Sequence, residues 1–338
     1  MELSGVPGPA PGGTPFDGDP RTLWRPGAYE APLQLSEVPA RRRTGFSGKK
    51  KAGRKAMAGR ADLLADLQEV MWAHVASAPK KEKAAVLAAI SARAPKPNES
   101  EARRRKLFGA RVEKSLQALE QGPRVLLVLQ GVDAAGKGGV VKSVASAMDP
   151  LGVDVTAFGR PTEDEARQHY LQRVIERLPA PGHVGVFDRS HYEDVLVPTV
   201  TGSHSEEEVA QRVEAIQIFE AELVRRGFVI VKVLLHISEQ EQQQRLLSRL
   251  EREHKHWKYR PADADAHAQF DTFQTVYSAL IEATDADHAP WNILGADRKW
   301  YSRLAVQELL IAALADLNLK WPAADYDVDQ ERKRLDGS

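Results

Sequence analysis

The chain has 338 residues, 47 basic and 47 acidic side chains, and no cysteine. The lack of cysteine excludes disulfides, zinc–thiolate sites and a cysteine nucleophile, and the length fits one large α/β domain with additions or two modest domains. No apolar run approaches the roughly 20 residues that span a bilayer, and no apolar stretch near the N-terminus suits a signal peptide. We therefore expect a cytoplasmic protein that does not bind membranes.

The first 57 residues are predicted to form a flexible extension. Residues 1–40 are rich in proline and glycine, which is typical of disordered or loosely docked segments. Residues 41–60 carry nine basic side chains and no acidic one. Such a run can bind a polyanion or form a solvated arm, and its lack of a hydrophobic period favours the solvated arm.

Residues 58–121 are predicted to form N-terminal helices. Apolar side chains recur at three- and four-residue spacing over 63–75, and two further helices are expected at 80–92 and 99–121. The pattern does not show whether these helices form a separate subdomain or pack on the following core.

Residues 122–320 are predicted to form an α/β core. Continuous apolar runs are typical of strands buried on both faces of a parallel sheet, and they occur at 124–130, 153–158, 183–187, 228–237 and 291–294. Helical stretches separate them, two of which begin with capping boxes, Thr162 with Glu165 and Ser238 with Glu241. The alternation predicts three layers, with a parallel sheet between helices. Residues 321–338 read as a loose polar tail.

A glycine loop follows the first predicted strand. Residues 131–139 read GVDAAGKGG and precede a predicted helix, which is the order of elements in a P-loop. Backbone N–H groups and the helix N-terminus would hold phosphate, and Lys137 would add a full positive charge. The other predicted phosphate-binding residues of this segment are Gly131, Ala134, Ala135, Gly136, Gly138, Gly139 and Lys142.

The loop departs from the usual pattern at two positions. Gly138 stands where a hydroxyl residue ordinarily binds magnesium, and Asp133 places a carboxylate in a phosphate cradle. That carboxylate would repel phosphate unless a cation lay between them. We predict that Asp133 binds Mg²⁺, with Mn²⁺ as a possible substitute, or that it accepts a proton from the attacking group.

The predicted strand at 183–187 leads directly into Asp188 and Arg189. An acid at this point suits a Walker B magnesium ligand, and the arginine would lie where ligands bind at the carboxyl edge of such sheets. Asp188 could instead cap a helix and pair with Arg189. The adjacent P-loop favours the magnesium role.

Residues 251–267 are dense in basic side chains and join two predicted helices. We interpret them as a lid that closes over phosphates, with Lys255, Lys258 and Arg260 as candidate contacts. A solvated loop is the alternative. The histidines at 254 and 256 lack the helical spacing of a shared metal site, so zinc is not predicted.

Together these motifs resemble the second family of polyphosphate kinases. The loop matches the family's G-x-D-A-[AG]-G-K-x-G, and residues 161–163 match its Pro-Thr-Glu segment. The stretch FDRSHYEDVLV, the lid pair Trp257-Lys258 and the segments 289–291 and 296–301 are also similar to the family. The resemblance covers about residues 100–318 and implies a P-loop kinase-like fold, as in thymidylate kinases, with a helical lid.

The resemblance also implies roles for residues. Asp133 and Asp188 would hold magnesium, Lys137 the transferring phosphate, and Arg189 the transition-state charge. Arg173 matches a family arginine near the phosphates. His267 stands where relatives carry a lid arginine, which would weaken the grip on phosphate there.

The implied reaction is reversible, Mg²⁺-dependent phosphoryl transfer between inorganic polyphosphate and nucleoside mono- or diphosphates such as AMP, ADP, GMP and GDP. The sequence at 190–197 is most similar to that of family members that phosphorylate both nucleoside mono- and diphosphates. The relatives also suggest a homo-oligomer. Two alternatives remain: an ATP-dependent nucleotide or small-molecule kinase, and a P-loop protein that binds nucleic acid through its basic arm. No nucleic-acid module is recognisable.

Overall fold

The chain is built around a five-stranded parallel sheet. In the computed structural model, which describes residues 13–336, the strand order is β2-β3-β1-β4-β5. The strands are β1 (Arg124–Gln130), β2 (Val153–Ala157), β3 (Val184–Asp188), β4 (Phe228–His236) and β5 (Trp291–Gly295). The β1–β3 register places Leu129 opposite Asp188, so the two strands that carry the predicted phosphate motifs end side by side.

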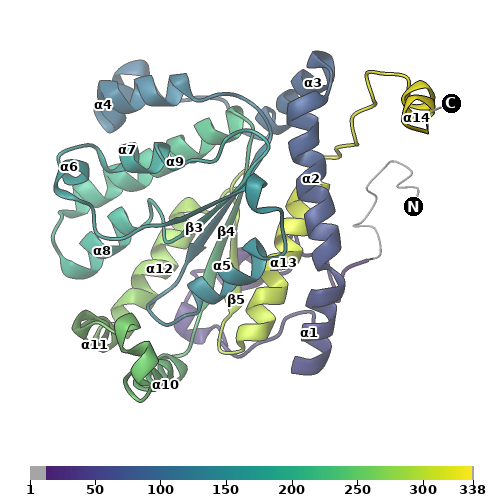
Figure 1. The fold of residues 1–338 in the computed structure, drawn as a ribbon. Coiled ribbons are helices and arrows are strands. Elements are labelled where there is room, and N and C mark those ends of the chain that lie inside the picture. The colour runs from purple at the N-terminus through teal and green to yellow at the C-terminus, as the bar shows by residue number, and fades with distance from the viewer. Residues whose placement is uncertain (1–12, 337–338) are drawn as a thin grey trace.

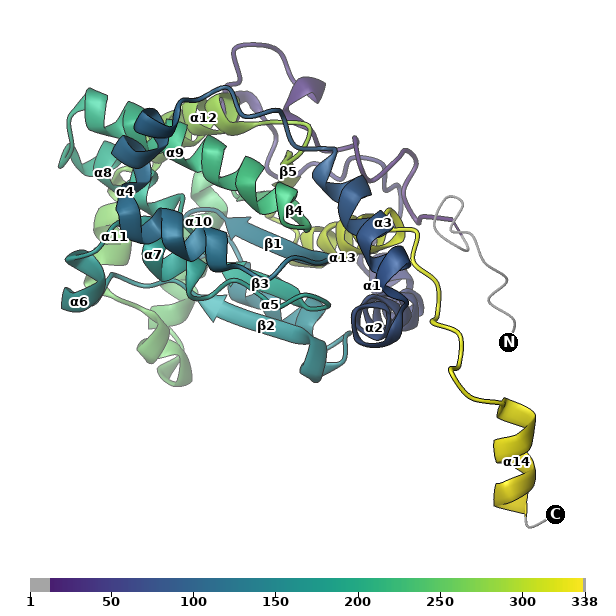
Figure 2. The same cartoon turned by 90° about the horizontal axis from the view of Figure 1, so that it is seen from above.

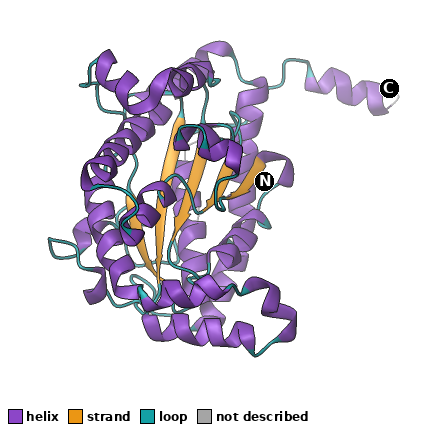
Figure 3. Cartoon of the chain, turned by 90° about the vertical axis from the view of Figure 1, so that its left-hand side faces the viewer, coloured by secondary structure: helices purple, strands orange, loops and turns teal. Residues whose placement is uncertain are grey.

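Helices cover both faces of the sheet (Figures 1 and 3). One layer contains α5 (Lys137–Ala145) and α13 (Lys299–Ala315), with α1 (Lys50–Gly59) and α2 (Ala61–Ser77) packed on α13. The other contains α7 (Tyr170–Ile175), α8 (Glu193–Thr201), α9 (Glu206–Arg225) and α12 (Phe270–Thr284). This is the three-layer α/β fold that the alternating pattern predicts.

Strand β1 shows why the sequence forms this sheet. All seven of its residues are buried, as expected for a strand hydrogen-bonded on both sides and covered by helices on both faces. Helix α13 is buried along its whole length except at Lys299 and Arg303. Those two positions lie one turn apart at its beginning, beside the carboxyl edge of the sheet.

The segment before α1 is packed onto the core, which corrects the prediction of a flexible extension for residues 13–57. Trp24 is 1% exposed, donates from Nε1 to Tyr301 Oη at 2.8 Å, and accepts the N–H of Ile293 at its carbonyl. Phe16 meets the Trp24 ring edge-on, and Leu35 is also buried. These anchors are spaced irregularly between prolines and glycines, so periodicity could not reveal them; residues 1–12 lie outside the described residues.

The predicted N-terminal helices pack on the core and do not form a separate subdomain. They are α2, α3 (Lys80–Ser91) and α4 (Glu101–Ala118), which contact α13, α9 and α7. Helix α4 breaks at Gly109, which has φ 69°. Helix α1 lies within the basic run at 41–60, for which the sequence favours a solvated arm.

The lid region is helical and lies at the carboxyl edge of the strands. It comprises α10 (Glu239–Leu250), the 3-10 helix η4 (Glu253–Lys258) and α11 (Pro261–Ala268), seen at the lower left of Figure 1. The capping box at Ser238 is only half formed, because Glu241 pairs with Arg245 at 2.8 Å. The box at Thr162 is complete and begins α6 (Glu163–Ala166).

The polar tail forms a short exposed helix. Helix α14 (Val328–Asp336) buries no residue and projects away from the body of the protein (Figure 2). In the described part of the chain, 13–336, no helix combines the length and apolarity that crossing a bilayer requires.

Candidate active site

The loop between β1 and α5 adopts the backbone of an anion cradle. Gly131 has φ 144°, Ala134 φ 65° and Gly136 φ 115°. A Cβ on Gly131 would lie 2.7 Å from the carbonyl oxygen of Leu235, so only glycine fits that turn. Ala134 lacks this freedom, and its left-handed conformation must be imposed by its surroundings.

The N–H side of the loop is open to a ligand. Within residues 13–336, no group accepts a hydrogen bond from the backbone N–H of Ala134, Gly136, Lys137 or Gly138. Consecutive N–H groups of this kind at a helix N-terminus attract anions. The arrangement fits a phosphate group between the loop and the first turn of α5.

The carbonyl side of the loop is held by side chains. Five consecutive carbonyl oxygens accept hydrogen bonds from three residues: Gly131 (2.5 Å) and Val132 (3.3 Å) from Lys137 Nζ, Asp133 (3.0 Å) from Gln242 Nε2, and Ala134 (3.0 Å) and Ala135 (2.9 Å) from Arg245 Nη1. In a planar trans peptide the C=O and N–H point in opposite directions. Holding the carbonyls of Asp133 and Ala135 therefore aims the N–H groups of Ala134 and Gly136 into the cradle, whereas the Ala135 N–H donates to Val132 O at 3.1 Å.

Asp133 and Arg189 form an ion pair across the site. Arg189 Nη2 lies 2.5 Å from Asp133 Oδ1, and its Nη1 lies 3.2 Å from Glu193 Oε2. Burial raises the pKa of Asp133, but the charges of Lys137 and Arg189 outweigh burial and hold that pKa below its ordinary value. Burial raises the pKa of Glu193, and its cationic neighbours only partly offset this.

Lys137 is buried where the two strands end. Burial and the charge of Arg189 lower the pKa of its ammonium, whereas Asp133, Asp188 and Glu193 favour the charged form. A Cβ on Gly138 would lie 3.9 Å from Asp188 Oδ2, so the Walker B carboxylate faces the first turn of α5. The structure thus brings together the four predicted catalytic residues.

The carboxylates fit a magnesium ion that is completed by other ligands. No group of three or more His, Cys, Asp or Glu side chains able to hold a metal occurs within the described range, 13–336. Magnesium is usually held by one or two carboxylates together with waters and substrate phosphates, and Asp133 and Asp188 are hard oxygen donors of that kind.

A buried polar cluster holds the segment after Arg189. Lys232 Nζ lies 2.6 Å from Glu220 Oε2 and donates to Tyr192 Oη at 2.9 Å, and Tyr192 donates to Glu220 Oε1 at 2.8 Å. His191 Nε2 lies 3.2 Å from the same Glu220 oxygen. Arg189 itself has φ 65°, so this cluster fixes the backbone just beyond a strained residue.

Two predicted phosphate ligands lie outside the loop and the first turn of α5. Arg173 is buried, donates to Asp194 Oδ2 at 2.9 Å and to Gly159 O at 3.0 Å, and lines a cavity among α4, α7, α8 and α9, so its phosphate-binding role stays a prediction. Lys142 is exposed in the last turn of α5, one turn beyond Gly138 on the same helix face. A phosphate-binding role for Lys142 stays a prediction.

The predicted lid residues also differ in their surroundings. The charge of Lys255 helps to lower the pKa of Lys299, after burial and Arg245. Lys258 and Arg260 are exposed. His267 does not stand in the open site, because its Nδ1 contacts Gln242 Oε1 at 2.7 Å. The structure therefore makes His267 a link inside the lid, unlike the predicted weak phosphate contact.

Several site residues were not predicted. They are Glu193, which pairs with Arg189; Gln242 and Arg245, which hold the loop; and Lys299 and Arg303, at the start of α13. A Cβ on Gly139 would lie 2.6 Å from Arg303 Nη2, so this guanidinium lies against the loop. The four-residue spacing from Arg189 to Glu193 could have indicated the first of these pairings.

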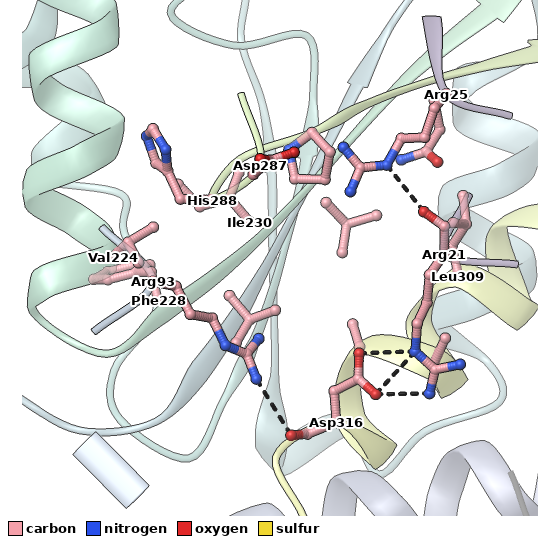
Figure 4. Close-up of a pocket in the computed structure, with 16 residues that line it drawn as sticks. Arg21, Arg25, Arg93, Val224, Phe228, Ile230, Asp287, His288, Leu309 and Asp316 are labelled. Carbon is pink, nitrogen blue, oxygen red and sulfur yellow. Dashed lines mark hydrogen bonds and ion pairs between the residues drawn. The ribbon is translucent and has the colours of Figure 1, made fainter. Parts of the chain in front are cut away.

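Two cavities lie outside the loop. One of about 190 Å³ is lined by Arg21, Arg25 and Arg93 near the start of β4 (Figure 4). It lies at the amino end of the sheet, opposite the phosphate loop, and Arg21 is occupied by Asp316 at 2.6 Å. The other, of about 540 Å³, lies among α4, α7, α8 and α9, and Asp194 links it to the active-site segment.

A parallel sheet whose first strand enters a glycine loop and helix, beside a strand ending in an acid, defines a P-loop kinase fold. Residues 96–321 match the family model described as Polyphosphate kinase 2 (PPK2), and the chain belongs to that family. The family and the fold predicted from the motifs are thereby confirmed.

Similar proteins support this assignment. An AMP/ADP-polyphosphate phosphotransferase of Meiothermus ruber is 39% identical over 218 residues, covering 64% of this chain and 82% of the relative. An ADP-polyphosphate phosphotransferase 3 of Rhizobium meliloti is 34% identical over 63% of this chain and 74% of the relative. A crystal structure of polyphosphate kinase 2 from Arthrobacter aurescens TC1 has 37% identity and a TM-score of 0.78, covering 96% of this chain and 98% of that one.

Proposed function

We propose that this protein transfers the terminal phosphoryl group of inorganic polyphosphate to a nucleoside mono- or diphosphate. A nucleotide phosphate oxygen attacks the terminal phosphorus, and the bond to the next bridging oxygen breaks. Polyphosphate loses one unit, and the nucleotide gains one. The observation that carries this proposal is the row of open loop N–H groups beside the Asp133–Arg189 pair, together with membership of the family.

The protein's own residues would act by positioning and charge. The loop N–H groups and Lys137 hold the migrating phosphoryl group, whose charge spreads over its oxygens in the transition state. Arg189 donates from a guanidinium whose orientation Asp133 and Glu193 fix. No covalent intermediate on the protein is needed, because such catalysis depends on alignment and electrostatic stabilisation.

Magnesium would be held by Asp133 and Asp188, and Mn²⁺ could replace it. When bound, the ion would neutralise phosphate charge that the two carboxylates would otherwise repel. Removing divalent ions with EDTA should abolish transfer, and adding Mg²⁺ back should restore it.

The 540 Å³ cavity is our candidate for the acceptor nucleotide. Its volume lies in the range of small-molecule sites, and its wall includes Tyr170 with the Arg212 guanidinium 4.8 Å from the ring centre. We expect Arg212→Gln to raise KM for the nucleotide and to leave KM for polyphosphate unchanged. Equal changes in both values would argue against this placement.

Product analysis separates this function from its rivals. Incubation with polyphosphate and AMP or ADP, without ATP as donor, should yield the nucleotide with one more phosphate. An ATP-dependent kinase would need ATP as the donor, and a nucleic-acid-binding protein would bind RNA or DNA with little competition from nucleotides. A cytoplasmic location and a homo-oligomeric state remain predictions, which fractionation and light scattering can check.

A further inference from the structure

The strained residue of the phosphate loop is held on both sides by one helix. Ala134 has φ 65°. The peptide before it is held through Asp133 O by Gln242 at 3.0 Å, and the peptide after it through Ala134 O by Arg245 at 3.0 Å. Gln242 and Arg245 are three residues apart on α10, so they project from the same helix face.

Gln242 is engaged at both ends of its carboxamide. Its side chain is 1% exposed. Its Nε2 can only donate and faces Asp133 O, which leaves its Oε1 as an acceptor facing His267 Nδ1 at 2.7 Å. This network assigns the proton of His267 to Nδ1. The chain of contacts therefore runs from α11 through α10 to the peptide of Asp133.

This chain differs from the other contact between the two lid helices. Arg249 on α10 donates to Asp263 on α11 at 3.0 Å and to the carbonyl of Lys258. Those groups belong to the lid itself, so that contact holds the lid together. Among the polar contacts that α11 makes in residues 13–336, only the one made by His267 continues to the phosphate loop.

We propose that Gln242 is a positioning residue, and that His267 acts through it to couple the lid to the phosphate loop. When the lid helix α11 is seated, His267 fixes the Gln242 carboxamide. Gln242 then fixes the Asp133 peptide, which aims the Ala134 N–H at the phosphate and places the Asp133 carboxylate beside Arg189. Displacement of α11 releases the first of these contacts and loosens the others. This inference rests on the phosphoryl transfer proposed above.

The test compares neighbouring glutamines of one helix. Gln242→Leu removes the contact with Asp133 O, whereas Gln243→Leu and Gln244→Leu change exposed positions next to it. Because a misplacement of about 1 Å can cost about a hundredfold in rate, we expect kcat for Gln242→Leu to fall about tenfold to a hundredfold. The melting temperatures of all three variants should stay close together, and the two controls should keep near wild-type kcat.

The role of His267 is tested by substitutions that keep or remove its donor. His267→Phe should lower kcat by a similar factor. His267→Gln, whose side-chain amide can still donate to Gln242, should keep most of the wild-type kcat. In the double variant His267→Phe/Gln242→Leu the losses should not multiply, because both changes break one chain of contacts. Multiplying losses, or full activity of His267→Phe, would overturn the proposal.

Binding of inorganic tripolyphosphate, measured by calorimetry, provides a readout without turnover. Gln242→Leu should bind it more weakly than Gln243→Leu and Gln244→Leu do. If the wild-type protein failed to transfer phosphate from polyphosphate, the proposed function would fall, while this comparison would still test the positioning of the loop. Equal tripolyphosphate affinity and equal kcat among the three leucine variants would rule out a positioning role for Gln242.

Discussion

Arg189 Nη2 lies 2.5 Å from Asp133 Oδ1, although the two residues follow different strands. The parallel register of β1 and β3 brings those strand ends together. The ion pair fixes the guanidinium beside the phosphate loop and, together with the charge of Lys137, keeps the pKa of the carboxyl below its ordinary value. It also shows how an acid can occupy a phosphate cradle before any divalent ion is bound.

Removing either charge of the loop should disable transfer. We expect Lys137→Ala and Asp133→Asn each to lower kcat by about 10²- to 10⁴-fold, because each change removes a charge that acts on the migrating group. Circular dichroism should show the same folded content as the wild type. Lys80→Ala, at an exposed lysine of α3, is the control, and near-normal turnover of either loop variant would remove that residue from its assigned role.

The glycines of the loop should differ in their tolerance of a side chain. Gly131→Ala forces a Cβ to 2.7 Å from Leu235 O at φ 144°, so it should destabilise the protein by about 1–3 kcal/mol. Gly138→Ala meets Asp188 Oδ2 at 3.9 Å, an ordinary contact. The free energy of unfolding measured in urea should therefore be lower for Gly131→Ala than for Gly138→Ala. The reverse order would show that the loop backbone differs from the one described.

Stability should begin to fall at mildly acidic pH. Burial lowers the pKa of His236 below its ordinary value of 6.5, and its Nδ1 is buried without a partner within residues 13–336. Its Nε2 donates to Val38 O at 2.8 Å. Protonation of His236 therefore favours the unfolded chain. The contribution of neutral His236 to the free energy of unfolding is full above pH 6.5, and it is lost as the pH falls from 6.5 through the lower pKa of the folded state.

Thermal melts between pH 5 and pH 8 check this expectation. His74 and His169 have pKa values lowered mainly by burial as well and should add to the decline. His236→Gln keeps a donor toward Val38 but cannot titrate, so its melting temperature should depend less on pH below 6.5. If the melting temperature of His236→Gln fell with pH as steeply as that of the wild type, His236 would not contribute to the pH dependence of stability.

The basic face of α1 should affect the binding of long polyphosphate donors but not that of short ones. Lys50, Lys51, Arg54 and Lys55 are exposed, and none forms an ion pair within the described residues. By contrast, Arg103 is paired with Glu214. Helix α1 packs beside the start of α13, on the same lower side as the lid in Figure 1.

Replacing these four residues of α1 by glutamine should raise KM for long polyphosphate about tenfold and weaken its salt dependence. KM for tripolyphosphate should stay unchanged. The same replacements at Lys80, Lys81, Lys83 and Lys96, in and after α3 at the opposite end of the molecule, form the control. An unchanged KM for the long donor across several salt concentrations would refute a role for α1.

Local patterns predicted the sheet and the phosphate loop. Strand β1, the loop and Asp188 could be recognised because each depends on neighbouring residues: a buried apolar run, glycines before a helix, and an acid at a strand end. The pairing of Asp133 with Arg189 follows from the parallel register, but only once the strand order is known.

Contacts between distant segments could not be predicted in this way. Trp24 anchors an aperiodic, proline-rich segment to Tyr301, a contact that no local pattern encodes. Gln242 lies in a run of three glutamines, and only the fold distinguishes it from its exposed neighbours. Arg173 is an arginine near the expected site, yet tertiary packing engages it with Asp194.

The most direct test of the central claim is a phosphate-transfer assay in which polyphosphate is the only donor. With Mg²⁺ and ADP or AMP, we expect ³¹P NMR to show the nucleotide gaining one phosphate while polyphosphate shortens, and we expect Lys137→Ala to abolish both changes. If the nucleotide were unchanged with polyphosphate but phosphorylated when ATP was supplied, the account of a polyphosphate-dependent transferase would be contradicted.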